Sequence, residues 1–220
     1  MTVTYHGHSA FKLKGKRGVV VTDPYSEAVG FALPSMTADI VTMSHDHFDH
    51  SASALVKPTA RRERPFLISK PGEYELGGIS VFGVQSFHDA SQGSERGKNT
   101  IYTILLDDIR ICHLGDLGHE LTDEQREFIG GVDVLLCPVG GSTTINPQEA
   151  VKVIRTLEPS IVIPMHYKTD RHDEKIFADL QPVSAFLKEY GVEAIAQAKL
   201  EIEKETLPEE TEVVVLTEQW

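Results

Sequence analysis

Six consecutive residues, His45-Asp46-His47-Phe48-Asp49-His50, contain three imidazoles and two carboxylates. Neutral imidazoles and carboxylates are the nitrogen and oxygen ligands that divalent ions such as zinc select in proteins. The segment therefore indicates a metal site. The alternative is a solvated polar turn that holds three histidines by coincidence.

Further candidate ligands follow other predicted strands. The segment 39–44 before the histidines is mostly apolar and β-branched, which predicts a short buried strand. Three later strands, expected at 79–87, 109–115 and 160–164, also end at metal-competent side chains. Because α/β proteins place their sites at the carboxyl ends of strands, we expect these side chains to meet. The candidates are His45, His47, Asp49, His50, His88, Asp116 and His166.

The remaining patterns favour an α/β fold. Short β-like runs at 3–5, 11–13 and 19–22 predict an antiparallel meander in the first half. Thr122 to Gln125 fits a capping box, and Asn146-Pro147 supplies an N-cap with proline at the first helical position. A third helix is expected from Pro182 to Tyr190. With no visible linker or repeat, residues 1–220 are expected to form a single domain.

Composition excludes some classes of function. The net charge of −12 disfavours nucleic acid as a substrate, and the basic cluster 61–64, between two prolines, reads as an exposed loop. No stretch approaches the roughly 20 apolar residues of a membrane span, and no signal peptide is visible, so we expect a cytoplasmic protein. Cys112 and Cys137 lie in apolar runs typical of buried thiols. The oligomeric state stays open, and an oligomer is allowed.

These motifs, in this order, resemble the metallo-β-lactamase superfamily over nearly the whole chain. The HxHxDH motif stands at 45–50 and is followed by the lone His88, by Gly115-Asp116 and by Pro164-Met165-His166-Tyr167. The resemblance implies a four-layer αβ/βα sandwich of two mixed β-sheets flanked by helices. Gly7-His8-Ser9, Thr22-Asp23-Pro24 and Gly140-Gly141 are similar to the single-domain metal-dependent hydrolases that include sugar-phosphate lactonases.

The resemblance also implies two divalent metal ions. His45, His47 and His88 would hold the first, Asp49, His50 and His166 the second, and Asp116 would bridge them. Zinc is the expected metal, and the oxygen-richer second site also suits manganese or iron. Two ions roughly 3.5–4 Å apart share a water and lower its pKa toward 7. The expected function is therefore hydrolysis of a small ester, lactone or phosphoester by a metal-bridging hydroxide.

Two residues are assigned catalytic roles beyond metal binding. Asp49 is expected to orient the attacking hydroxide, and His119, one short loop after Asp116, to contact the substrate. His8 and Tyr167 are interpreted as structural. Asp23 has two readings, as the acceptor of a ligand histidine's second N–H or as a simple turn residue.

The substrate is not identified by the sequence. The polar segment 89–98 is expected to be a mobile loop beside His88. Its Arg96 and Lys98 would either neutralise an anionic substrate or be merely solvated. The alternative to a hydrolase is a non-hydrolytic metal-binding protein or a di-iron redox protein on the same scaffold.

Overall fold

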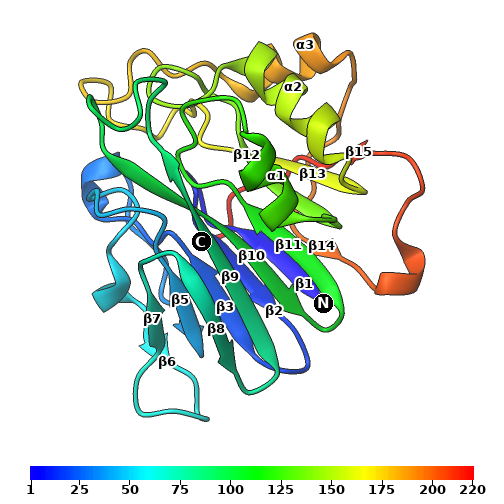
Figure 1. Cartoon of the computed structure of the whole chain (residues 1–220). Helices are drawn as coiled ribbons and strands as arrows, with labels where there is room; N and C mark the ends of the chain where they lie inside the picture. Colours follow the sequence, from blue (N-terminus) through cyan, green and yellow to red (C-terminus); the bar gives the residue numbers. More distant parts are fainter.

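Two β-sheets lie face to face in the computed structural model (Figure 1), which describes residues 1–220. The six-stranded sheet consists, in spatial order, of β14 (Leu200–Glu201), β1 (Thr2–Tyr5), β2 (Phe11–Lys14), β3 (Val19–Thr22), β5 (Ile40–Thr42) and β7 (Phe66–Ile68). The seven-stranded sheet consists of β15 (Glu212–Val213), β13 (Ile161–Met165), β12 (Val134–Pro138), β11 (Ile109–His113), β10 (Lys98–Leu106), β9 (Ile79–Phe87) and β8 (Gly72–Leu76). A separate pair is formed by β4 (Thr37–Ala38) and β6 (Lys57–Pro58).

Both sheets are mixed. In the first, β1, β2 and β3 are antiparallel, whereas β3, β5 and β7 run parallel. In the second, β8 to β11 are antiparallel and β11, β12, β13 and β15 are parallel. The antiparallel meander expected in the first half is therefore right for β1 to β3 and wrong for β5 and β7. The residues between β3 and β5 cross over the outer face of the sheet instead of forming a hairpin.

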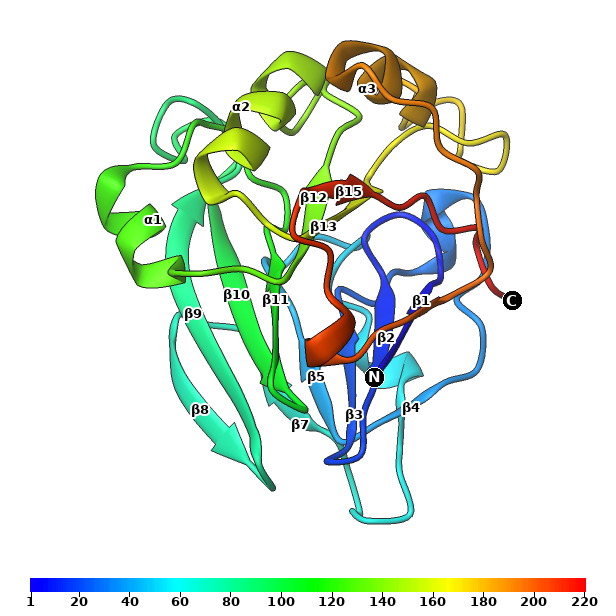
Figure 2. The ribbon, with the colours of Figure 1, turned by 90° about the vertical axis from the view of Figure 1, so that its right-hand side faces the viewer.

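The α-helices cover the seven-stranded sheet (Figure 2). They are α1 (Asp123–Ile129), α2 (Pro147–Leu157) and α3 (Val183–Tyr190). Both expected N-terminal motifs are confirmed, because Thr122 and Gln125 form one capping box and Asn146 and Glu149 another. Helix α1 packs against β9, and α2 packs against β12 and α3.

Short 3-10 helices accompany the rest of the chain. They are η1 (Glu27–Val29), η2 (Ser53–Leu55) and η3 (Lys204–Thr206). On the outer face of the six-stranded sheet, Val21 and Val41 pack with Met36 and Val56 from the neighbouring loops. The architecture is the expected αβ/βα sandwich, although no α-helix lies in this outer layer.

The core lies between the two sheets. Alternate residues such as Val20 and Ile40 face inward into a cluster of 40 buried hydrophobic residues, as the two-residue period of a strand requires. Strands β12 and β13 are buried at every position, which is typical of parallel strands covered on both faces. Cys112 and Cys137 are free thiols inside this core, as expected, and burial raises the pKa of Cys112 to about 12.

No helix has the combination of length and apolar character that would let it cross a membrane.

Candidate metal centre

The expected ligands meet where their strands end. His45 to His50 follow β5, His88 follows β9, Asp116 follows β11, and His166 follows β13. The candidate ligand atoms of each group lie within 4.8 Å of one another. The groups are His45, His47 and His88; His8, Asp49, His50 and His166; and His45, His50 and Asp116. The side chains are placed as the sequence analysis expected, with His8 in addition, while metal binding itself stays a prediction.

Asp116 lies at the centre of this arrangement. Its Oδ2 is 3.1 Å from His88 Nε2, 3.2 Å from His166 Nε2 and 3.3 Å from His50 Nε2. These histidines belong to both expected metal groups, so the carboxylate is suited to a bridging position. The backbone N–H of Asp116 donates to Asn99 Oδ1 at 3.0 Å. Gly115 permits this approach, because a Cβ there would lie 2.3 Å from Asn99 Oδ1.

The charges of the centre depend on one another. Burial raises the pKa of Asp116, but His166 and His50 outweigh it and hold that pKa well below its usual value. Burial likewise lowers the pKa of His50, but Asp116 and Asp49 outweigh it and raise that pKa. Burial and the nearby His50 lower the pKa of His45 to about 3. The buried carboxylates thus require positive charge, which either an imidazolium or a cation can supply.

The orphaned polar atoms show that a metal ion fits. Buried polar atoms nearly always have hydrogen-bond partners, and one without a partner costs about 1–3 kcal/mol. Four such atoms meet at this place, because His45 Nε2, His50 Nε2 and His166 Nε2 lie within 3.9 Å of Asp116 Oδ2, and Asp116 Oδ1 likewise has no partner. Lone pairs directed at a common point are what a divalent ion needs.

Asp23 orients one of the proposed ligands. Its Oδ2 accepts from His50 Nδ1 at 2.8 Å, and its Oδ1 accepts from the backbone N–H of Ser44 at 2.7 Å. The contact with His50 agrees with the first of the two roles considered for Asp23, that of acceptor for a ligand histidine's second N–H. Because Nδ1 carries the proton, the lone pair of His50 Nε2 points toward the centre.

We expect Asp23→Asn to weaken metal binding by about 10- to 100-fold, because the amide no longer fixes the tautomer of His50 with a charged acceptor. Competition with a chromogenic chelator measures this change. A matched control is Asp39→Asn, another buried aspartate, whose carboxylate accepts from Val19 N. Equal metal affinities for the two variants would contradict the role given to Asp23.

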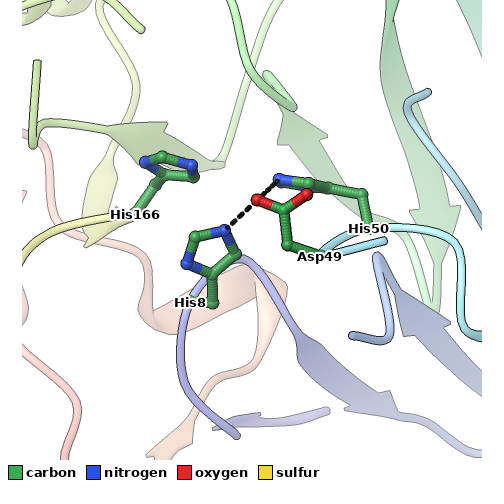
Figure 3. A group of neighbouring side chains, drawn as sticks. All are labelled: His8, Asp49, His50 and His166. Atoms are coloured by element: carbon green, nitrogen blue, oxygen red, sulfur yellow. Dashed lines mark hydrogen bonds and ion pairs between the residues drawn. The ribbon is translucent and has the colours of Figure 1, made fainter. Parts of the chain in front are cut away.

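A second chain of hydrogen bonds supports Asp49. The backbone N–H of Thr169 donates to His172 Nδ1, so the proton of a neutral His172 is on Nε2. That N–H donates to His8 Nδ1 at 3.2 Å, and His8 Nε2–H in turn donates to Asp49 Oδ2 at 3.1 Å. Figure 3 shows His8, Asp49, His50 and His166 directed toward one another. In this tautomer His8 holds Asp49 in place and offers no lone pair to an ion.

Backbone strain also marks the centre. His8, Asp23 and His166 all have positive φ values, of 53°, 39° and 51°. Non-glycine residues rarely adopt this conformation, and it is concentrated at functional sites. His8 was interpreted as structural in the sequence analysis, yet it follows β1 as the other candidates follow their strands. Its position after the end of β1 is the signal by which the sequence could have placed His8 at the centre.

His119 lies outside the cluster. Its Nε2 accepts from the backbone N–H of Phe87 at 3.1 Å, and its Nδ1 donates to the carbonyl of Glu120 at 2.7 Å. Arg96 lies at the centre's edge, where it lines a cavity of about 210 Å³ together with His47, Asp49, His88 and Asp116. Tyr167 is buried, in line with its structural interpretation.

Comparison with known proteins gives consistent matches. Residues 2–166 match the family model described as a beta-lactamase superfamily domain. The chain is 29% identical over 190 residues to a UPF0173 metal-dependent hydrolase of Thermococcus onnurineus, covering 76% of this chain and 84% of the relative. A crystal structure from Thermotoga maritima, assigned as a Zn-dependent hydrolase of the metallo-beta-lactamase superfamily, is 38% identical. Its TM-score is 0.78, and the match covers 98% and 97% of the two chains.

A more distant structure shares the fold. A metallo hydrolase from Ignicoccus hospitalis has a TM-score of 0.67 at 21% identity, with 92% of this chain and 99% of that chain covered.

Proposed function

Because the chain belongs to the beta-lactamase superfamily, we propose that it is a dinuclear metal-dependent hydrolase of a small ester, lactone or phosphoester. The observation that carries the proposal is the presence of two histidine-rich groups on either side of Asp116. The similarity to metal-dependent hydrolases supports the same class of reaction. Zinc is the expected ion, and manganese or iron also suits the second position.

The proposed ligands are those of the sequence analysis. His45, His47 and His88 would hold one ion, Asp49, His50 and His166 the other, and Asp116 would contact both. When bound, two divalent ions lower the pKa of a shared water and polarise the oxygen of the scissile bond. Asp23 and His8 then act on the ligands His50 and Asp49 through hydrogen bonds, without contact with the substrate.

Asp49 is proposed to orient the attacking hydroxide as well as to hold the second ion. Burial raises the pKa of Asp49, but His50 and the hydrogen bond from His8 outweigh it and lower that pKa, so the side chain is a carboxylate at neutral pH. One of its oxygens accepts from His8. The other would contact the second ion, where it can also orient the attacking hydroxide.

The substrate-binding role expected for His119 has a direct test. Both of its ring nitrogens are hydrogen-bonded to the main chain, which favours a structural role. We therefore expect His119→Ala to lower the melting temperature by a few degrees, consistent with about 1 kcal/mol for a lost hydrogen bond, and to leave KM unchanged. Steady-state kinetics and thermal denaturation measure the two effects. A several-fold rise in KM at unchanged melting temperature would instead support the substrate contact.

The proposed function is tested by metal analysis together with a substrate screen. Purified protein is assayed with generic ester, lactone, phosphodiester and thioester substrates, before and after treatment with a chelator. We expect metal-dependent hydrolysis of at least one class and its loss in His45→Ala. Metal binding with no hydrolysis of any class would favour the non-hydrolytic or di-iron alternative.

A further inference from the structure

A large cavity adjoins the metal centre and contains most of the positive charge near it. This cationic cavity has a volume of about 670 Å³ and is lined by His45 and His47 on one side. The side chains of Lys70, Arg96 and Lys98 also line it, and no hydrophobic residue does. Asp46 is the one carboxylate in the lining. An excess of positive charge next to a hydrolytic centre attracts an anionic group.

The three cations have no acidic partner in the protein. Lys152, Lys168 and Lys204 form ion pairs elsewhere on the surface, whereas Lys70, Arg96 and Lys98 form none. The protein has a net charge of −12, so acidic groups are plentiful. The donors of these three side chains are therefore available to a ligand.

The backbone of the loop that carries Arg96 is hydrogen-bonded to a single carboxylate. The Asp89 carboxylate accepts hydrogen bonds from the backbone N–H groups of Ser91, Gly93, Glu95 and Arg96, at 2.8 to 3.1 Å. Burial raises the pKa of Asp89, but these donors outweigh it and bring that pKa to about 2. Asp89 directly follows the proposed ligand His88, so Arg96 is fixed relative to the metal centre.

The other two cations are also fixed through the main chain. The carbonyl oxygen of Lys70 accepts from Tyr74 Oη at 3.0 Å and from Tyr102 Oη at 3.3 Å. Lys98 is the first residue of β10 and pairs with Phe87 of β9. Preorganised backbones reduce the entropy lost when the side chains close on a ligand.

The cavity of about 210 Å³ on the other side of Arg96 has a different character. Its apolar residues are Phe48, Ile176, Phe177 and Leu180. Phe48 and Ile176 are 44% and 52% exposed, so both can present apolar surface to a ligand in this cavity. His47 and Arg96 line both cavities, so the two meet at the metal centre. We call this cavity of about 210 Å³ the apolar cavity.

We propose that the substrate is amphipathic, with a carboxylate or phosphate group held by Arg96, Lys70 and Lys98 and an apolar group in the apolar cavity. This inference rests on the proposed function, because it places the scissile bond between the two cavities. Arg96 is the main specificity residue, since it lines both cavities and a guanidinium can bind an oxyanion through two N–H groups.

Binding measurements on the metal-containing protein test the cationic cavity. Isothermal titration calorimetry compares 4-phenylbutyrate with the neutral 4-phenylbutan-1-ol, which differ only in the terminal group. We expect the anion to bind about tenfold more tightly, and Arg96→Ala and Lys70→Ala each to remove most of that preference. Lys57→Ala, which removes an exposed lysine lining neither cavity, is the matched control. A 3-phenylpropylphosphonate arm, with the same number of methylenes, shows whether a phosphate-like group is bound more tightly than a carboxylate.

Equal preferences in Arg96→Ala, Lys70→Ala and Lys57→Ala would overturn the proposal. Anion binding that survives both cavity variants would instead mean that the metal alone holds the anion. A kinetic arm compares mono-p-nitrophenyl glutarate with p-nitrophenyl pentanoate. The ratio of their kcat/KM values is expected to fall about tenfold in Arg96→Ala and to stay at the wild-type value in Lys57→Ala. If wild-type protein cleaves no ester of either kind, the proposed ester hydrolysis fails, while the binding arm still decides the fate of the cationic cavity.

Discussion

Asp116→Asn is expected to reduce metal-dependent hydrolysis by on the order of 1000-fold and to lower the metal content of the protein. Asp116 Oδ2 is within 3.3 Å of three histidine rings from both groups. Each 1.36 kcal/mol corresponds to a factor of ten in rate, so a 1000-fold loss means that the carboxylate contributes about 4 kcal/mol to stabilisation of the transition state. An amide can still occupy the volume of the carboxylate, so the fold should persist.

Steady-state kinetics and elemental analysis of the same preparation measure both effects. Asp108→Asn is the matched control, because Asp108 is exposed in the turn of the β10–β11 hairpin, at the end remote from His113 and Asp116. The control should keep wild-type metal content and rate. Full metal content together with wild-type hydrolysis in Asp116→Asn would show that this residue does not join the two positions.

Removal of the bound metal is expected to lower the melting temperature by about 8–16 °C. An ion present at 1000 times its dissociation constant stabilises the folded protein by about 4 kcal/mol. For a chain of this length, each kcal/mol changes the melting temperature by about 2–4 °C. The difference between metal-bound and metal-free protein should be smaller at low pH, because protons compete with the ion for the imidazoles and weaken its binding.

The metal-free protein should itself be acid-sensitive. Burial lowers the pKa of His8 to about 4 and of His45 and His172 to about 3. In the unfolded chain these groups titrate near pH 6.5. Between pH 6.5 and about 4 the unfolded state therefore binds more protons than the folded state, and the stability of the fold decreases as the pH is lowered. His50 acts in the opposite direction, since its raised pKa contributes stability below pH 6.5 that is lost as pH rises. In all, six histidines have lowered pKa values, whereas only His50 and His88 have raised ones, so net destabilisation by acid is expected.

Melting curves of chelated and zinc-reloaded protein at pH 7.5, 6.0 and 5.0 measure both effects. The reloaded sample controls for damage by the chelator. A melting temperature that is insensitive to chelation, or one that rises on acidification without metal, would contradict this account.

The strand ends explain how much of the centre could be predicted. His45, His88, Asp116 and His166 each follow a buried strand, and that pattern is visible in the local sequence. The register of the sheets then brings them together. The two capping boxes could likewise be predicted, because their signals lie within four residues.

Other features depend on contacts between distant segments. His8 and His172 are 164 residues apart, and nothing in the local sequence of either indicates their hydrogen bond. In the loop 89–98, one carboxylate accepts from four backbone donors, which the polar composition alone does not indicate, and the mobility of the loop stays a prediction. The two-residue strands β14 and β15 are too short to give a periodic signal. The single domain over residues 1–220 and the cytoplasmic location stay predictions.

Crystallographic anomalous scattering at the zinc edge, on protein loaded with zinc, tests the dinuclear centre most directly. The account predicts two peaks per chain, one contacting His45, His47 and His88 and the other contacting Asp49, His50 and His166, with Asp116 in contact with both. His8 should contact Asp49 and neither peak. A single peak, or a second peak held by His8 in place of Asp49, would contradict the account.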